Sequence, residues 1–171
     1  MLAKPRVPNR FPRMKTVLNV CCILAAVSLA NPSNLPATDD APRVVQIHAG
    51  VGNVVKFDVS RIPASPGETL KIVLTNSSSL PKNLMGHNWF LLKAGSDVVA
   101  FATAAAPEVA NAYFPAKLSG QVIAHIGLLG PGQSGEVIFK APSEPGDYPF
   151  LCSFPGHALI GMKGLLVVAK K

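Results

Sequence analysis

Three residues whose side chains bind soft metal ions occur close together near the C-terminal end of the sequence: Cys152, His157 and Met162. Thiolate, imidazole and thioether groups together suit copper, which moves between two oxidation states. Their spacing of five positions would separate neighbours by about 16 Å in a strand, and would turn them about 140° apart on a helix. Pro155-Gly156 therefore predicts a turn that brings the three side chains to one point.

A second histidine, His87, lies far upstream within the sequence Met-Gly-His-Asn-Trp. It is far enough from Cys152 to arrive from another strand. Two histidines, one cysteine and a weakly bound methionine form the trigonal ligand set of blue copper sites. Zinc is the main alternative, because one cysteine and two histidines also bind zinc. Taken singly, Cys152, Met162 and His87 could be packing residues, as a buried cysteine usually is, and His157 could be a histidine of a surface loop. The combination favours copper.

The segments around these residues resemble the cupredoxins, and within that family the azurins. The similarity runs through roughly residues 43 to 170 and is strongest at 80–89, 122–125, 129–130, 152–157 and 162–164. Four residues separate His157 from Met162, one more than in the azurin loop and the same number as in the auracyanins. The azurin disulfide has no counterpart, since no second cysteine follows residue 22.

The resemblance implies one bound copper ion that cycles between Cu(I) and Cu(II). The implied ligands are His87, Cys152 and His157 as strong equatorial ligands, with Met162 and the backbone carbonyl of Gly86 as weak axial ones. The side chain of Asn88 is expected to connect the two ligand loops, a supporting role outside the ligand shell. The backbone amides of Asn88 and Phe154 are expected to donate hydrogen bonds to the sulfur.

The resemblance also implies an apolar docking patch around the exposed edge of His157. Its expected members are Leu80, Leu84, Met85, Pro155, Gly156, Leu159 and Ile160. Exposed apolar patches mark contacts with partner proteins, and short-lived redox complexes use small interfaces. The sequence therefore predicts a monomeric carrier of single electrons, not an enzyme, whose partners are redox proteins such as cytochromes.

Two other functions remain open. A copper storage or delivery protein uses several exposed methionine or cysteine ligands, whereas the mature chain offers one cysteine and, besides Met162, only Met85. An electron-entry domain of a copper enzyme, such as a nitrite reductase, works with a second metal and its own histidine cluster. Only His48 and His125 remain to build one, and neither is assigned a function.

The N-terminal residues predict export. Five basic residues among the first fifteen account for most of the formal charge of +7, and without them the chain carries only +2, which argues against a nucleic-acid partner. They precede an apolar run at 16–30 that is typical of a secretory signal peptide. We therefore expect a signal peptide at 1–30, a proline-rich tether at 31–42, and a periplasmic cupredoxin domain at 43–171. The protein would stay at a membrane only with an uncleaved or lipidated leader.

The remainder of the chain predicts an all-β fold. Of its 171 residues 49% are hydrophobic, enough for a sizeable core. Short β-branched and alternating runs occur at 44–48, 54–59, 70–75, 88–92, 121–125, 135–140, 148–152 and 164–169. Eight such runs predict an eight-stranded Greek-key β-sandwich. The alanine-rich segment at 97–116 interrupts them and predicts a helical flap insertion, with Pro107-Glu108 resembling a second helix start.

Overall fold

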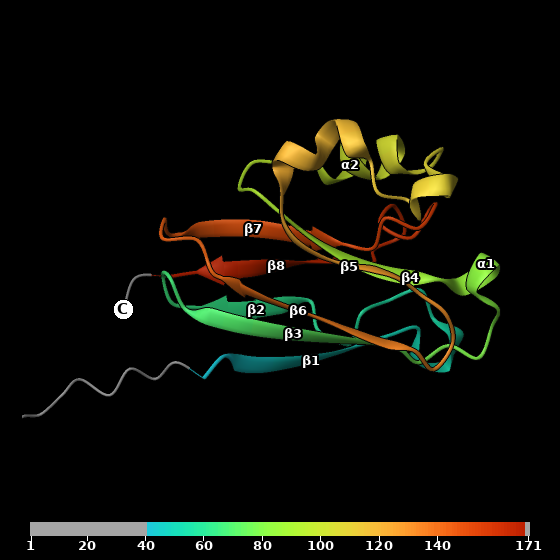
Figure 1. Ribbon diagram of the computed structural model, residues 1–171, viewed down its shortest axis with the longest axis horizontal. Coiled ribbons are helices and arrows are strands. Elements are labelled where there is room, and N and C mark those ends of the chain that lie inside the picture. The colour runs from blue at the N-terminus through green and yellow to red at the C-terminus, as the bar shows by residue number, and fades with distance from the viewer. Residues whose placement is uncertain (1–40, 170–171) are drawn as a thin grey trace, which may run out of the picture. The chain divides into compact units, whose positions relative to one another are not determined.

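The computed structural model describes residues 41–169, which form a single unit (Figure 1). The predicted signal peptide at 1–30 lies outside the described residues, as does the predicted tether apart from its last two positions. None of the helices in the described range is long and apolar enough to cross a membrane.

Two β-sheets face each other in this unit. The first contains β1 (Arg43–Ala49), β3 (Thr69–Asn76) and β6 (Ser134–Lys140), in the order β1-β3-β6. The second contains β2 (Arg61–Ala64), β8 (Lys163–Val168), β7 (Gly146–Leu151), β4 (His87–Leu92) and β5 (Val122–Leu129), in that order. The pairs β1–β3 and β2–β8 are parallel and the other pairs antiparallel. The prediction of an eight-stranded β-sandwich is confirmed.

The core between the sheets follows from the alternation of side chains along each strand. In β3, Leu70, Ile72 and Leu74 are all fully buried, while the residues between them are half-buried. From the opposite sheet, Trp89 and Phe150 pack together with ring centroids 5.7 Å apart. Residues that alternate in sequence thus meet across the interface between the two sheets.

The prediction of a strand at 54–59 is wrong. The chain makes a tight loop there, and Phe57 forms only an isolated antiparallel bridge with Ala49. A side chain replaces part of the ladder, because Asp58 Oδ1 accepts a hydrogen bond of 2.7 Å from the His48 amide. Val55 and Val59 of this segment pack partly against the core and Phe57 is buried, whereas Val54 is exposed.

The second strand of the chain is instead β2, at 61–64. Its sequence, Arg-Ile-Pro-Ala, contains a proline, which cannot donate a ladder hydrogen bond. The strand nevertheless forms because β2 lies at the edge of the five-stranded sheet and pairs only with β8. Proline is tolerated at such edges.

The flap at 97–116 covers the outer face of the five-stranded sheet, above β7 and β5 in Figure 1. It begins with α2 (Val98–Ala105), capped by Asp97, and continues through η2 (Val109–Asn111) and η3 (Ala116–Gln121). The predicted helical insertion is thus present, although 3-10 turns and not a second α-helix follow Pro107-Glu108. Because the flap covers its outer face, β4 is buried along its whole length.

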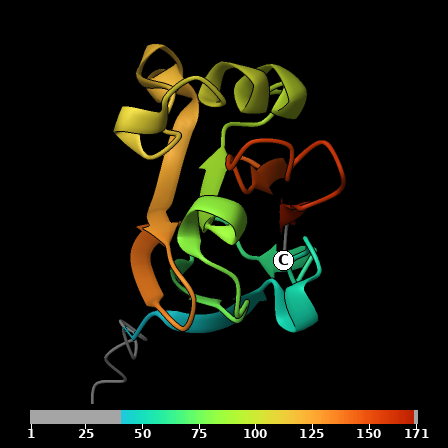
Figure 2. The ribbon, with the colours of Figure 1, turned by 90° about the vertical axis from the view of Figure 1, so that its right-hand side faces the viewer.

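Three loop segments gather at one end of the sandwich. These are η1 (Val51–Asn53), the short helix α1 (Lys82–Met85) and the loop that joins β7 to β8. Figure 2 views this end, with α1 near the centre and the other two segments beside it. Asn53 Oδ1 accepts hydrogen bonds from the Ser78 hydroxyl and the Ser79 amide, which joins η1 to the chain before α1. The predicted metal ligands lie at this end.

Candidate metal centre

His87 is the first residue of β4, directly after α1. Gly86 joins the two elements in an extended conformation and is buried. A Cβ at this position would lie 2.6 Å from the Lys82 carbonyl, so only glycine allows this close return of the chain. The pairing of β4 with β5 shifts register between His87 and Trp89. Such irregularities re-aim a side chain and are common beside functional sites.

Asn76 fixes the backbone just before Gly86 to the end of β5. Its amide nitrogen donates to the carbonyls of Met85 and Leu129, each at 3.0 Å, and its oxygen accepts from the Ser78 amide. The side chain is fully buried and takes the place of a core residue after Leu74. Sequence reasoning missed this residue. Its signal is a polar side chain at an inward position of an alternating strand.

The loop after β7 brings the three C-terminal residues together through its own backbone. The His157 amide donates to the Phe154 carbonyl at 3.0 Å, and the Met162 amide donates to the His157 carbonyl at 2.9 Å. The Cys152 amide closes the loop on the Met162 carbonyl at 3.1 Å. Gly156 occupies the left-handed region with a φ of 83°, which explains the glycine at the turn.

His87, Cys152 and His157 form a compact buried cluster. One nitrogen from each histidine and the cysteine sulfur lie within 4.8 Å of one another. Nδ1 of His157 is 3.5 Å from Cys152 Sγ and Nδ1 of His87 is 4.0 Å from it. His87 and Cys152 are fully buried and His157 is 5% exposed. No other group of this kind occurs among residues 41–169, and His48 and His125 stand apart from it.

Burial keeps all three groups uncharged near neutral pH in the metal-free protein. It lowers the pKa of His157 to about 4 and that of His87 to about 4, with a smaller contribution to His87 from the charge on His157. It raises the pKa of the Cys152 thiol to about 12, against hydrogen bonds from the Asn88 and Phe154 amides that lower it. Neutral imidazoles can bind a metal directly, whereas the thiol must first release its proton.

Asn88 joins the two ligand segments. Its Nδ2 donates to Ser153 Oγ at 2.8 Å, and its Oδ1 accepts from the Ser153 amide at 2.7 Å. Both residues are fully buried. The residue after His87 and the residue after Cys152 are thereby fixed to each other. Sequence reasoning singled out Asn88 but not its partner Ser153.

The remaining predicted residues surround this cluster. Met162 is fully buried in the same core cluster as Cys152 and Phe154. The members of the predicted docking patch range from half-buried to exposed: Leu80 and Met85 are half-buried, and Leu84, Pro155, Gly156, Leu159 and Ile160 are exposed. The second ring nitrogen of His87, Nε2, is buried and has no hydrogen-bond partner among the described residues. It faces Gly50, where a Cβ would lie 2.5 Å from it.

This donor set fits copper. Two imidazoles and one thiol converge in a site shielded from water, and the two Nδ1 atoms are the ones that face the sulfur. Residues 44–169 match the model of the copper-binding proteins of the plastocyanin/azurin family.

The chain is a cupredoxin.

Its relatives include both azurins and auracyanins. Over 83 residues it is 45% identical to auracyanin B of Chloroflexus aurantiacus, a match that covers 48% of this chain and 35% of that protein. Over 103 residues it is 38% identical to the azurin of Pseudomonas chlororaphis, covering 59% of this chain and 79% of the azurin. The chain thus spans about a third of the length of that auracyanin B.

Comparison with solved structures also finds auracyanins. The cupredoxin superposes on auracyanin B with a TM-score of 0.66 and 31% identity, covering 75% of this chain and 91% of the other. It superposes on auracyanin A, a "blue" copper protein of Chloroflexus aurantiacus, with a TM-score of 0.65 and 32% identity, covering 75% and 100% respectively. Family, relatives and the His-Cys-His cluster together show that this cupredoxin binds a single copper ion.

Without copper, the protein should lose stability in mild acid. The unfolded chain takes up protons on its histidines near pH 6.5, whereas folded His87 and His157 resist protonation until about pH 4. Stability rises with pH wherever the unfolded state binds more protons, so it should fall between about pH 6.5 and pH 4. We expect a loss on the order of 5 kcal/mol at pH 4.5, since this pH lies about two units below the unfolded pKa of each of the two histidines and one unit corresponds to about 1.4 kcal/mol. Urea unfolding of the metal-free protein at pH 7 and pH 4.5 measures it.

Two variants test whether the buried histidines cause this pH dependence of stability. His87→Gln should flatten this pH dependence because it removes one of the two groups. His125→Gln, a change at an exposed position, should leave it unaltered. A metal-free protein equally stable at pH 7 and pH 4.5 would contradict the prediction.

Proposed function

We propose that this cupredoxin carries single electrons between redox proteins outside the cytoplasm. The observation that supports this most directly is the buried cluster of His87, Cys152 and His157, which lies beneath exposed apolar loops. We assign these three residues as the strong copper ligands. Met162 and the Gly86 carbonyl are proposed as the weak axial ligands of the trigonal set.

Bound copper would supply a reversible one-electron change, and the protein's part is to hold its ligands still. The Asn88–Ser153 hydrogen bonds fix the two ligand segments to each other. The amides of Asn88 and Phe154 donate to the sulfur and stabilise its anionic form. Full burial of His87 and Cys152 excludes water. A cage that is already in place changes little when the charge changes, which favours rapid electron transfer.

The proposed docking patch lies over His157. Leu84 is 62% exposed on α1, while Leu159 and Ile160 are 56% and 69% exposed on the ligand loop. Large apolar side chains at such exposure are typical of a contact surface. His157 is the most exposed member of the ligand cluster, at 5%. We therefore propose that the electron passes through His157 to a partner protein, which binds transiently through a small interface.

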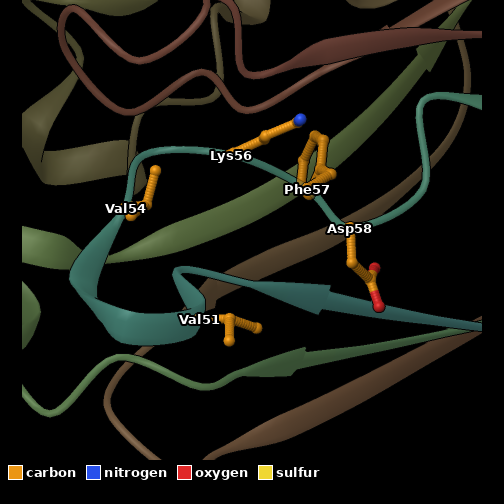
Figure 3. Close-up of a pocket in the computed structure, with 5 residues that line it drawn as sticks. All are labelled: Val51, Val54, Lys56, Phe57 and Asp58. Carbon is orange, nitrogen blue, oxygen red and sulfur yellow. The ribbon is translucent and has the colours of Figure 1, made fainter.

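The loop after β1 extends this apolar end. Val51 and Val54 are 56% and 60% exposed. Together with Phe57 they line a pocket whose rim carries one positive and one negative side chain, Lys56 and Asp58 (Figure 3). Hydrogen bonds from the Ser78 and Ser79 segment to Asn53 hold this loop beside the chain that leads into α1. The sequence did not place this loop in the patch.

Ile160→Lys should slow electron self-exchange. Two copies of the protein must bring the same patch together for this reaction, and like charges facing each other across an interface cost several kcal/mol. We expect a reduction of about tenfold or more, because 1.4 kcal/mol corresponds to tenfold. The blue absorption should be unchanged, since Ile160 is 69% exposed and is not one of the proposed ligands. Line broadening in NMR spectra of mixed oxidised and reduced protein measures the rate.

Val44→Lys is the matched control. It adds the same charge at an apolar side chain that is 51% exposed. Val44 lies at the start of β1, whereas the metal centre adjoins its far end, about 20 Å away along the strand. Its self-exchange rate should stay near that of the parent. Equal rates for Ile160→Lys and the parent would show that electrons leave through another face.

A further inference from the structure

The flap contains two consecutive residues in a conformation that they rarely adopt. Ala112 and Tyr113 follow η2 with φ values of 50° and 63°. Left-handed backbone is unfavourable for residues with a Cβ, and it usually occurs at single positions. Such strained conformations persist only where the surrounding structure holds them, and they gather at functional sites. The contacts that hold Tyr113 therefore indicate what the flap does.

The backbone of Tyr113 is held by Ser153, which lies beside the metal centre. Its carbonyl accepts a hydrogen bond of 2.6 Å from Ser153 Oγ. The same hydroxyl accepts from Asn88 Nδ2 at 2.8 Å, so one buried oxygen connects the flap to both ligand segments. Ser153 directly follows Cys152, and Asn88 directly follows His87. The chain of hydrogen bonds therefore ends one residue from a cluster member on each side.

Tyr113 is also held through its ring. The half-buried phenol ring lies edge-on against Phe154, with centroids 5.1 Å apart. Phe154 in turn packs on His157, with centroids 4.6 Å apart. The ring of Tyr113 thus supports the third member of the cluster through one intervening side chain. Backbone and ring act on different ligand residues from a single position of the flap.

We propose that Tyr113 is a positioning residue of the copper site, and that the flap acts as a latch that holds the ligand loop in its binding geometry. The latch includes Tyr113, Ser153 and Phe154. It positions the loop before copper arrives, so that the metal-free protein already has the ligands in place. The proposal rests on the ligand assignment made above, but it does not depend on the electron-carrier role.

Ser153→Ala tests the hydrogen-bonded half of the latch. The change leaves the Tyr113 carbonyl without its donor and Asn88 Nδ2 without its acceptor. In the full chain without copper, amide hydrogen exchange at 108–116 and 153–162 should become at least tenfold faster. In the copper-loaded protein, release of copper to a chelator should become at least tenfold faster. Ser153→Thr, which keeps the hydroxyl, should restore both rates toward the parent values.

Tyr113→Ala tests the ring half at a position that tolerates change better, because Tyr113 is only half-buried. We expect faster copper release and faster exchange at 153–162, and Tyr113→Phe should behave like the parent. The matched control is Thr103→Ala, which removes another flap hydroxyl, bonded to the Val99 carbonyl within α2. This control should change neither rate at the ligand loop.

The outcomes separate the latch from the ligand assignment. Parent rates of exchange at 153–162 and of copper release in both Ser153→Ala and Tyr113→Ala would overturn the latch. Equal effects from Thr103→Ala would also overturn it, because the flap would then act only through general stability. If the parent itself lacked the intense blue absorption, the ligand assignment would fail, and exchange in the metal-free protein would still decide whether the latch exists.

Discussion

Replacing Cys152 with serine is expected to abolish the intense blue absorption of the copper-loaded protein. The colour of a trigonal blue copper site depends on its thiolate, and Cys152 is the one cysteine among the described residues. Serine keeps nearly the same shape in this fully buried position, but its hydroxyl does not ionise near neutral pH. The visible spectrum and the copper content of the purified variant measure the effect together.

The two other cysteines provide the control. Cys21 and Cys22 belong to the predicted leader, far upstream of the ligand residues. Changing both to serine should leave the absorption of the copper-loaded protein intact. An intense band that survives in Cys152→Ser would rule out the proposed ligand set.

Gly50→Ala should weaken copper binding and destabilise the fold, although Gly50 is not a ligand. Its φ of 74° disfavours any side chain, and an added Cβ would lie 2.5 Å from His87 Nε2 and 3.1 Å from Ser78 Cβ. The His87 ring would have to move away from Gly50, which displaces its Nδ1 from its place opposite the Cys152 sulfur. We expect a loss of about 2–4 kcal/mol in unfolding free energy, from the left-handed backbone and the overpacking together. Copper affinity should fall at least tenfold.

Gly52→Ala separates the two causes. Gly52 has a similar φ of 63°, but an added Cβ there would have no neighbour within 4 Å. This variant should lose only about 1–2 kcal/mol through its backbone, and it should bind copper like the parent. Urea unfolding and competitive copper titration measure both variants. Equal copper affinity for the two would show that Gly50 does not position His87.

The sequence alone was enough to recognise the metal chemistry and most of the fold. Cys152, His157 and Met162 are informative because their side-chain types restrict the metal and their turn is local. The alternation in β3 predicts its buried face because side-chain direction in a strand depends only on position. The alanine-rich run at 97–116 likewise predicts a helix from neighbouring residues, and α2 is observed within it, capped by Asp97.

The tertiary structure decided how the ligand residues are supported. The partners of Asn76, Ser153, Gly50 and Tyr113 cannot be predicted from neighbouring residues, because each acts on a residue between 9 and 65 positions away. Contacts with distant residues also explain why the prediction of a strand at 54–59 is wrong. Its β-branched residues favour a strand, yet Asp58 caps β1 across the loop, while proline-containing β2 forms because β8 lies beside it. Side-chain chemistry indicates the metal and local sequence patterns indicate most of the strands. Contacts between distant segments determine which residues hold the site in place.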